Sequence, residues 1–511
     1  MELVAFIFYF LLILGIGLYF FFRSKGSGEK EYFLGGRSMG PWVTAMSAQA
    51  SDMSGWLLMG FPGSILAFGM GMVWIGIGLA LGTAANWIFV AKRLRRFSKA
   101  SGDSITLPQY LTNRFASQNP VLKIICAIIF LISFTVYVSS AFVAGKSVMV
   151  AVIPWFQDKQ MLAMAIFALL ILVYTFLGGY KAVCWTDFFQ GLLMLIALLA
   201  VPIVMAMGDF DGSMKAAFAE GVSAFESNPF TADWRDIVTG LSWGLGYFGM
   251  PHIIVRFMGI QKPSQVKKAS TVAISWVVLS LGSAIAFAVL GRTYILSDGT
   301  TSLAETLLPA GAQQDIFITL AKNIFPPVIA GLLLAAIVAA AMSTADSQLL
   351  VASSSFTSDL YKPLIRKNKA SDKETLWVGR IVVLIVSVVA FAIAASGTSW
   401  ASSIMAMVEN AWGLFGAAFG PVVLLSLFWK RLNYVGACTG IVVGALVDIA
   451  WLLCFTNTIM PALVVPTGIY EILPGFIAGG IAAVIVSLAT KAPSHAVENI
   501  YARATDSSID D

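Results

Sequence analysis

Apolar runs of roughly 20 residues recur along nearly the whole of this chain, and each is long enough to cross the hydrocarbon core of a bilayer as a helix. Of its 511 residues, 58% are hydrophobic and 12% are charged, whereas soluble domains have about 45–50% apolar and about 25% charged residues. We therefore predict an all-α polytopic membrane protein without a sizeable soluble domain. The first run has no basic segment before it and no small-residue cleavage site after it, so we expect a retained helix, not a signal peptide.

Hydropathy predicts about thirteen transmembrane helices, at 3–22, 41–67, 69–91, 121–152, 160–178, 187–207, 236–255, 270–290, 316–347, 376–396, 403–428, 437–457 and 470–490. The connections between them alternate in charge. One set holds 24 of the 32 Lys and Arg residues and the other set holds five. Because basic connections stay on the cytoplasmic side, we expect the N-terminus outside, the C-terminus inside and a polar, mobile cytoplasmic tail at 491–511.

Two apolar stretches are interrupted near their middle. The stretch 41–68 is broken by the polar run Ala50–Gly55, and the stretch 236–255 is broken by the glycine-rich run Gly244–Pro251. Irregular backbone at membrane depth must line a cavity or be buried in protein, and two broken helices in corresponding places point to the binding site of a transporter. The alternative is that the glycines are close-packing positions between helices, which explains the polar run less well.

The two breaks also suggest an internal repeat within one transporter domain that covers 1–511. Five predicted spans within 41–207 can be laid over five within 236–428, and each set opens with a broken helix. Because five is odd, the second set enters the membrane from the opposite side, which makes the repeats inverted. This prediction depends on hydropathy and on the two breaks alone.

Asp52 lies within the first break, where an ionised side chain is expensive and marks a functional site by default. It either faces a hydrated cavity near a cation or braces the unwound backbone through amide donors, and both interpretations place it beside the site. A small alkali cation requires oxygen ligands, which unwound helix ends supply as carbonyls. Ser343 and Thr344 offer two hydroxyls in the ninth span, although such hydroxyls also bond back to carbonyls one turn earlier.

The second break offers the residues of an organic-substrate site. Trp243, Tyr247 and Pro251 recur at four-residue spacing, so a near-helical segment would carry them on one face. Aromatic rings stack on a small apolar ring, and exposed amides at a helix N-terminus attract a carboxylate. The alternative is that these aromatics only pack or anchor the helix at a membrane interface. Weaker candidates for the same pocket are Ser54, Trp56 and Tyr137.

Asp187 follows Trp185 and Thr186 near the predicted start of the sixth span. It holds a second cation or a proton, or it caps the helix, and Thr or Asp at a helix start favours capping. Asp346 is its candidate partner, or lies at the inner mouth of the ninth span.

Several function classes are disfavoured. The four cysteines are scattered singly and there are two histidines, so neither a disulfide framework nor a metal centre is indicated. The sequence contains no Walker loop, so ATP-driven transport is not indicated. It shows no catalytic triad or metal cluster, so an enzyme is disfavoured. We expect no cofactor and no nucleic-acid partner. A passive channel and a receptor remain rivals, although no signalling domain follows Ala492.

Five segments resemble the solute:sodium symporter family, and within it the branch that carries proline. They are Tyr32-Phe-Leu-Gly-Gly-Arg-Ser-Met-Gly-Pro, Ser51-Asp-Met-Ser-Gly-Trp-Leu-Leu-Met-Gly, Trp243-Gly-Leu-Gly-Tyr-Phe-Gly-Met-Pro-His, Met342-Ser-Thr and Gly416-Ala-Ala-Phe-Gly-Pro. The resemblance extends from the first helix to about Pro493. It implies a LeuT-like fold with a 5+5 inverted repeat, in which the second and ninth spans meet.

The resemblance also implies an activity and its residues. The activity would be sodium-coupled import of L-proline across the cell membrane by alternating access. Another small solute, such as pantothenate, a sugar or a choline-like osmolyte, is the alternative. The implied sodium ligands are the main-chain oxygens of Ala50, Met53 and Ala340 and the hydroxyls of Ser343 and Thr344. The implied proline site is Ser54, Trp56, Tyr137, Trp243, Tyr247 and Pro251. Asp52 and Asp187 match residues tied to ion coupling, whereas Asp346 and Ser347 fall where the family varies more, which leaves any further ion site open. Lipid is the expected surrounding, and the oligomeric state is not indicated.

Overall fold

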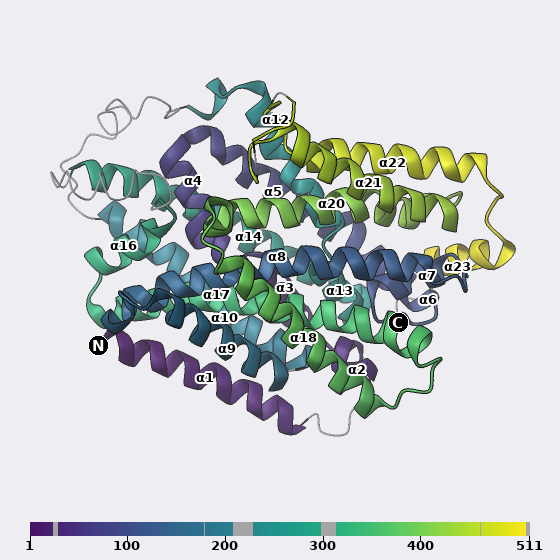
Figure 1. Cartoon of the computed structure of the whole chain (residues 1–511), viewed down its shortest axis with the longest axis horizontal. Helices are drawn as coiled ribbons and strands as arrows, with labels where there is room; N and C mark the ends of the chain where they lie inside the picture. The colour runs from purple at the N-terminus through teal and green to yellow at the C-terminus, as the bar shows by residue number, and fades with distance from the viewer. Residues whose placement is uncertain are drawn as a thin grey trace.

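The computed structural model describes residues 1–23, 29–177, 179–207, 228–297, 313–459, 461–464 and 466–506. The regular secondary structure of these residues is helical, and their one β contact is an isolated bridge between Met39 and Ile260. Within these described ranges, ten helices are long and apolar enough to cross a membrane. They run side by side along the long axis of the molecule, with the N-terminus at one end and α23 (His495–Thr505) at the other (Figure 1).

The first part of the described chain contains α1 (Glu2–Arg23), α2 (Glu29–Leu34), η1 (Gly35–Arg37), α3 (Pro41–Asp52), η2 (Trp56–Gly60), α4 (Phe61–Phe68), η3 (Met70–Met72), α5 (Val73–Ala85), η4 (Asn86–Ala91), α6 (Lys92–Ala100), α7 (Leu107–Arg114), α8 (Val121–Val152), η5 (Pro154–Phe156), α9 (Gln160–Leu177) and α10 (Tyr180–Met207). α3, η2 and α4 form the first broken span. The predicted span 121–152 has the same bounds as α8. The third span is longer than predicted, because α5, η4 and α6 continue it to Ala100.

The second part contains η6 (Pro229–Thr231), α12 (Trp234–Ser242), η7 (Trp243–Phe248), α13 (Pro251–Gly259), η8 (Pro263–Gln265), α14 (Val266–Ser297), η9 (Gln313–Asp315), α16 (Ile316–Ile324), α17 (Pro327–Ser354), η10 (Ser355–Ile365), α18 (Asp372–Ala394), α19 (Ser399–Ser402), α20 (Ile404–Phe428), α21 (Tyr434–Phe455), α22 (Ile472–Ala489) and α23 (His495–Thr505). α12, η7 and α13 form the second broken span.

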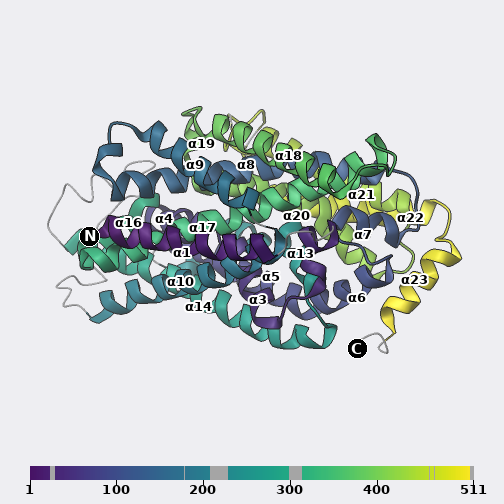
Figure 2. The same ribbon diagram turned by 90° about the horizontal axis from the view of Figure 1, so that it is seen from below.

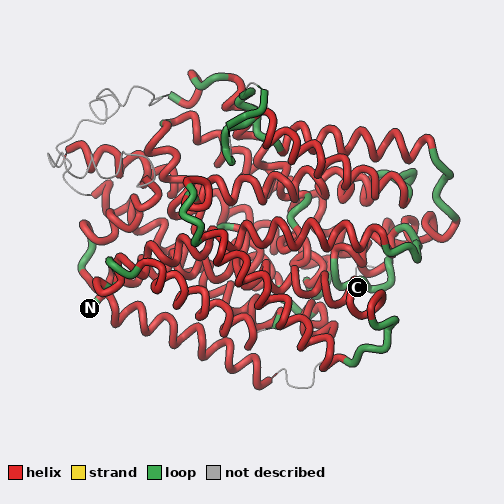
Figure 3. The backbone as a smooth tube through the Cα atoms, viewed as in Figure 1, coloured by secondary structure: helices red, strands yellow, loops and turns green. Residues whose placement is uncertain are grey.

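Burial separates the central helices from the lipid-facing ones. α17 and α20 are 83% buried over their most apolar window, whereas α1 and α22 are 28% buried. Leu384, Ile385 and Val388 keep a large exposed fraction on α18, as expected where lipid replaces a protein neighbour. Figure 2 shows α17 and α20 enclosed within the bundle and α18 along its edge. The tube in Figure 3 shows how few loops interrupt the bundle in its middle.

Three further predictions were wrong. The stretch 316–347 is not one helix, because α16 ends at Ile324 and a Pro–Pro pair starts α17 at Pro327; the residue before a proline is driven out of helical geometry. α10 begins at Tyr180 rather than at 187. The tail is not simply mobile, since α23 packs against α6 and α7, and the Tyr501 ring meets Phe97 at 5.3 Å. Residues 507–511 lie outside the described part.

Candidate functional site: two broken helices joined at the centre

The first break lies where the sequence places it. α3 ends at Asp52, and Met53 leaves helical geometry at φ −83° and ψ 75°. The Ser54 amide donates to the Asp52 carbonyl at 3.0 Å, and the Ser54 hydroxyl accepts from the Trp56 amide at 3.1 Å. A π-helical turn, η2, then restarts the span. Ser54 therefore supports the irregular backbone, and the prediction of a break here is confirmed.

The second break is a tightened helix followed by an extended residue. η7 has 3-10 geometry from Trp243 to Phe248, and Met250 at φ −76° and ψ 108° separates it from α13, which starts at Pro251. The glycines of η7 also approach their neighbours closely. A Cβ on Gly82 of α5 would lie 2.4 Å from the Gly244 carbonyl oxygen. Both sequence interpretations are therefore correct, because the segment is irregular and its glycines permit close packing.

One hydrogen bond joins the two breaks. The Tyr247 hydroxyl donates to Asp52 Oδ2 at 2.5 Å, and both side chains are buried. The main chain of η7 is held in turn by Asn86, whose Nδ2 donates to the Tyr247 carbonyl at 2.9 Å. The hydrogen bond to the Asp52 carboxyl group thus comes from a side chain of the other broken span and not from backbone amides. This geometry favours the cavity interpretation of Asp52.

A small closed cavity lies between the breaks. Its walls are Asp52, Met53, Trp56, Leu79, Tyr137, Trp243, Tyr247, Val408 and Trp412. The volume open to the centre of a water-sized molecule is only ≈ 10 Å³, about what one water requires. Four of the six predicted substrate residues line this cavity, whereas Ser54 supports the break and Pro251 starts α13. A solute the size of an amino acid needs the aromatic walls to move apart.

Trp243 separates this cavity from a larger one. The second cavity, of ≈ 300 Å³, is lined by Ser64, Phe68, Gly71, Met72, Ile75, Asp236, Thr239, Gly240, Trp243, Met405 and Glu409. It lies toward the end of the bundle that carries α4 and α12 (Figure 1). Trp243 stacks on Trp56 with ring centroids 5.5 Å apart, and Trp412 Nε1 donates to the Trp243 carbonyl at 2.8 Å. A change in the Trp56–Trp243 stack would therefore connect the two cavities.

An oxygen-rich site lies on the other side of the first break. α3 and α17 pack together, and the Ser343 hydroxyl lies 2.8 Å from the Ala50 carbonyl oxygen and 3.2 Å from that of Ala340. Thr344 Oγ1 is buried without a hydrogen-bond partner among the described residues. These neutral oxygens fit a hard monovalent cation, which prefers oxygen ligands. The contact between the second and ninth spans is confirmed, and the ligand role of these residues stays a prediction.

Asp187 belongs to a fully buried polar network. Because α10 begins at Tyr180, Asp187 lies inside the helix and cannot cap it, so the capping interpretation was wrong. Its Oδ2 accepts from Ser47 Oγ at 2.7 Å and forms an ion pair with Arg256 at 3.2 Å. Arg256 also donates to Ser347 Oγ, next to the buried Asp346. The network links α3, α10, α13 and α17.

Arg256 and Asn86 are the polar residues that the sequence reasoning missed. Arg256 was assigned to a basic connection, but α13 continues to Gly259 and the Arg256 side chain is 1% exposed. An arginine one turn after His252 in an apolar helix was the available signal, because a buried cation requires an acidic partner. Asn86 lies within an apolar run, where its amide also needed a partner.

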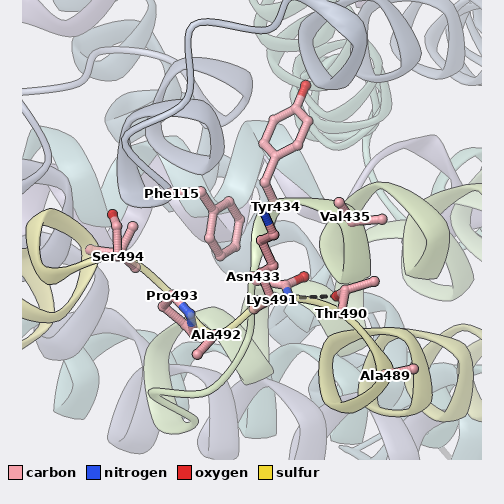
Figure 4. Close-up of a pocket in the computed structure, with 11 residues that line it drawn as sticks. Phe115, Asn433, Tyr434, Val435, Ala489, Thr490, Lys491, Ala492, Pro493 and Ser494 are labelled. Atoms are coloured by element: carbon pink, nitrogen blue, oxygen red, sulfur yellow. Dashed lines mark hydrogen bonds between the residues drawn. The ribbon is translucent and has the colours of Figure 1, made fainter.

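The opposite end of the molecule is closed by basic side chains. Arg37 pairs with Asp103 at 2.8 Å and donates to the Ser104 carbonyl at 2.8 Å, while Arg95 donates to the Ile260 carbonyl at 2.7 Å. Burial lowers the pKa of Arg37, and Asp103 opposes that shift. Beside this end lies a cavity of ≈ 540 Å³, lined in part by the connection from α22 to α23. There Asn433 donates to Thr490 Oγ1 at 2.7 Å, the bond drawn as a dashed line in Figure 4.

A helical bundle in which two interrupted helices meet at a buried cavity is the architecture of an ion-coupled transporter. The chain matches the family model described as "Sodium:solute symporter family" over residues 32–444 and belongs to that family. It is a multi-pass membrane protein. A sodium/proline symporter of Staphylococcus aureus (strain JH9) is 42% identical over 503 residues, which are 96% of this chain and 93% of that protein.

Solved structures agree on the fold. A Na⁺-coupled sialic acid symporter, in a substrate-bound outward-open state, has a TM-score of 0.75 and 22% identity over 96% of this chain and 98% of that one. MhsT in complex with L-phenylalanine has a TM-score of 0.50 and 15% identity over 87% of this chain and 97% of that one. The prediction of a LeuT-like all-helical fold is therefore confirmed at the level of architecture.

Proposed function

We propose that this chain imports L-proline into the cell together with sodium, by alternating access, in the plasma membrane. The family and the 42% identity to a sodium/proline symporter support this assignment. The observation that carries the coupling is the position of the first break. Ala50 contacts the Ser343 hydroxyl, while Asp52 and Met53 line the cavity beside Trp243. One short irregular segment therefore connects the sodium ligands with the substrate cavity.

The proposed sodium ligands are the oxygens of Ala50, Met53, Ala340, Ser343 and Thr344. In the structure the Ser343 hydroxyl is directed at carbonyl oxygens that would otherwise face the ion. Sodium binding turns the hydroxyl oxygen toward the cation and fixes α3 against α17. This fixes Asp52 and Met53, and it pre-shapes the proline cavity. Coupling of this kind is reciprocal, so sodium and proline raise each other's affinity by the same factor.

Proline is proposed to lie between Trp56, Tyr137, Trp243 and Tyr247, with Ser54 and Pro251 shaping the two breaks. Aromatic faces suit its apolar ring. Entry requires Trp243 to part from Trp56, because Trp243 lines both the closed cavity and the larger one. At the other end, the Asp187–Arg256 pair and the Arg37 contacts must open for release. Each sodium ion entering with the membrane potential supplies about 2.3 kcal/mol per 100 mV, so no cofactor and no chemical reaction are needed.

The proposal includes thirteen spans in a 5+5 inverted repeat, with the repeats at 41–207 and 236–428, the N-terminus outside and the C-terminus inside. The concentration of Lys and Arg in one set of connections supports this orientation. The test replaces the four native cysteines, places a single cysteine at Glu2 or at Asp511, and labels intact cells with an impermeant maleimide. Labelling of the cysteine at position 511 before the cells are permeabilised would contradict the proposed orientation.

The test of the function is proline uptake into proteoliposomes. We expect proline to accumulate above its external concentration when an inward sodium gradient is imposed and to equilibrate without it. Equal accumulation in both conditions would refute sodium symport. Competition of labelled proline with pantothenate, sugars and choline-like solutes separates the substrate from its alternatives, and stronger uptake of one of these would replace proline.

A further inference from the structure

A groove outside the transport path combines cationic, hydroxyl and apolar side chains. One wall is formed by η4 and α6, at the end of the third span, and the other by the start of α14. The volume of the groove is ≈ 520 Å³. We call it the lysine groove. It is lined by Trp87, Ile88, Lys92, Val266, Lys267, Ser270, Thr271, Ile274 and Ser275. No acidic side chain is among them, and the groove belongs to the basic end of the bundle, where α6 lies (Figure 2).

Local structure fixes the floor of the lysine groove. The turn Asn86–Ala91 is π-helical, a geometry that frequently marks functional positions within α-helices. The Ser270 hydroxyl lies 3.4 Å from the Trp87 carbonyl oxygen, so the two walls are in polar contact. Trp87 itself is buried and meets the Phe257 ring at 4.6 Å. The floor is therefore rigid and packed, whereas the side facing away from the bundle is open.

The chemistry of the groove changes along its length. Lys92, Lys267 and Thr271 are exposed at the basic end. Ile88 is 59% exposed, and Val278, one turn beyond Ile274, is 54% exposed. Cations and a hydroxyl therefore stand at one end and a lipid-facing apolar surface at the other. This order matches a phospholipid with a negatively charged headgroup and its acyl chains, since basic pockets between transmembrane helices bind such headgroups.

We propose that the lysine groove is a binding site for an anionic phospholipid. Lys92 and Lys267 bind the phosphate, Thr271 and Ser275 lie beside the headgroup, and the acyl chains lie along Ile88 and Ile274. Other cavities fit this ligand less well. The cavity in Figure 4 presents one lysine, and its Asn433 amide is already bonded to Thr490 and to the Lys491 carbonyl.

Occupancy of the groove connects to the transport site through adjacent residues. Asn86 donates to the Tyr247 carbonyl in the second break, and Trp87, the next residue, forms the groove wall. A bound lipid that stabilises η4 therefore also stabilises the support of Tyr247. This consequence depends on the proposed function, whereas the binding site itself does not.

Native mass spectrometry of the purified full chain in detergent tests the site. Wild type is titrated with phosphatidylglycerol and, separately, with phosphatidylcholine, and we expect tight adducts with phosphatidylglycerol alone. The double variant Lys92→Gln/Lys267→Gln should bind phosphatidylglycerol roughly thirtyfold more weakly, since a lysine near an anionic lipid contributes about 1 kcal/mol. Lys268→Gln is the matched control. It removes one positive charge from the helix that carries Lys267, but Lys268 lies outside the groove, 5.8 Å from the Trp42 ring. The affinity of this variant for phosphatidylglycerol should stay within about twofold of wild type.

The proposal is overturned if the double variant keeps the wild-type affinity, if Lys268→Gln weakens binding equally, or if phosphatidylcholine binds as well. Displacement by soluble glycerol phosphate at the same concentration would also overturn it, because the acyl chains would then contribute nothing. Should the double variant fail to fold, Ser275→Trp fills the groove with both lysines retained, and its thermal unfolding midpoint verifies folding. Loss of the adduct supports the site and an unchanged adduct refutes it. Absence of proline uptake by wild type would refute the transport function without affecting this readout.

Discussion

The hydrogen bond between Tyr247 and Asp52 is predicted to stabilise the contact between the two broken helices. The change that tests it is Tyr247→Phe, which removes only the donor hydroxyl. Hydrogen bonds between helices in membrane proteins average about 0.6 kcal/mol and reach about 1.7 kcal/mol. The Tyr247–Asp52 bond should lie near the upper limit, because its length is 2.5 Å and Asp52 is only 5% exposed. We therefore expect a coupling energy of about 1.5 kcal/mol.

The coupling energy is measured with a double-mutant cycle of Tyr247→Phe and Asp52→Ala. The free energy of unfolding of each variant is obtained by SDS titration followed by tryptophan fluorescence. Tyr137→Phe is the matched control, because the Tyr137 hydroxyl lies 3.5 Å from the Asp52 main-chain oxygen, which Asp52→Ala retains. Its cycle should be additive within about 0.5 kcal/mol. A Tyr247–Asp52 coupling below about 0.5 kcal/mol would show that the two breaks are not joined there.

Three further changes have defined outcomes. Ser343→Ala should raise the sodium concentration for half-maximal uptake about 5–30-fold, since a hydrogen bond or ligand oxygen contributes about 1–2 kcal/mol. Ser354→Ala on the same helix removes a hydroxyl that bonds only its own helix and should leave that concentration unchanged. Asp187→Asn leaves the buried Arg256 without its ion-pair partner and should lower the free energy of unfolding in SDS by about 3–5 kcal/mol; a loss below about 1 kcal/mol would contradict the ion pair. Gly82→Ala places a Cβ 2.4 Å from a carbonyl oxygen of η7 and should lower the free energy of unfolding in SDS by about 1–3 kcal/mol through overpacking. An unchanged free energy of unfolding would contradict the close approach.

The sequence predicted the helices well where hydropathy alone determines them. The bounds of α8 were correct, and both breaks were located because polar or glycine-rich runs at membrane depth have few explanations. Predicted helix boundaries were wrong where polar residues lie inside the end of a helix. The start of α10 was placed seven residues too late, because Tyr180–Thr186 includes a lysine and polar residues that hydropathy assigns to a connection.

The candidate site was predicted residue by residue but not as a geometry. Asp52 and Tyr247 were each singled out, yet their hydrogen bond joins segments far apart in sequence, and neither hydropathy nor spacing encodes such a pairing. Arg256 was missed for the same reason, because its burial depends on Asp187 from another helix. The contact of Ser343 with Ala50 was expected only through the family resemblance. Local physics therefore identified irregular backbone and costly polar groups, and tertiary packing determined which of them meet.

The central claim is that sodium and the solute bind beside the irregular segments of two broken helices, with α17 completing the sodium site and α8 the solute site. An experimental density map of the protein with sodium and proline bound tests this most directly. We predict an ion between the oxygens of Ala50, Met53, Ala340, Ser343 and Thr344, and proline in an enlarged cavity between Trp56, Tyr137, Trp243 and Tyr247. Ion and solute density away from both breaks, with 41–68 and 236–255 as continuous helices, would contradict the account.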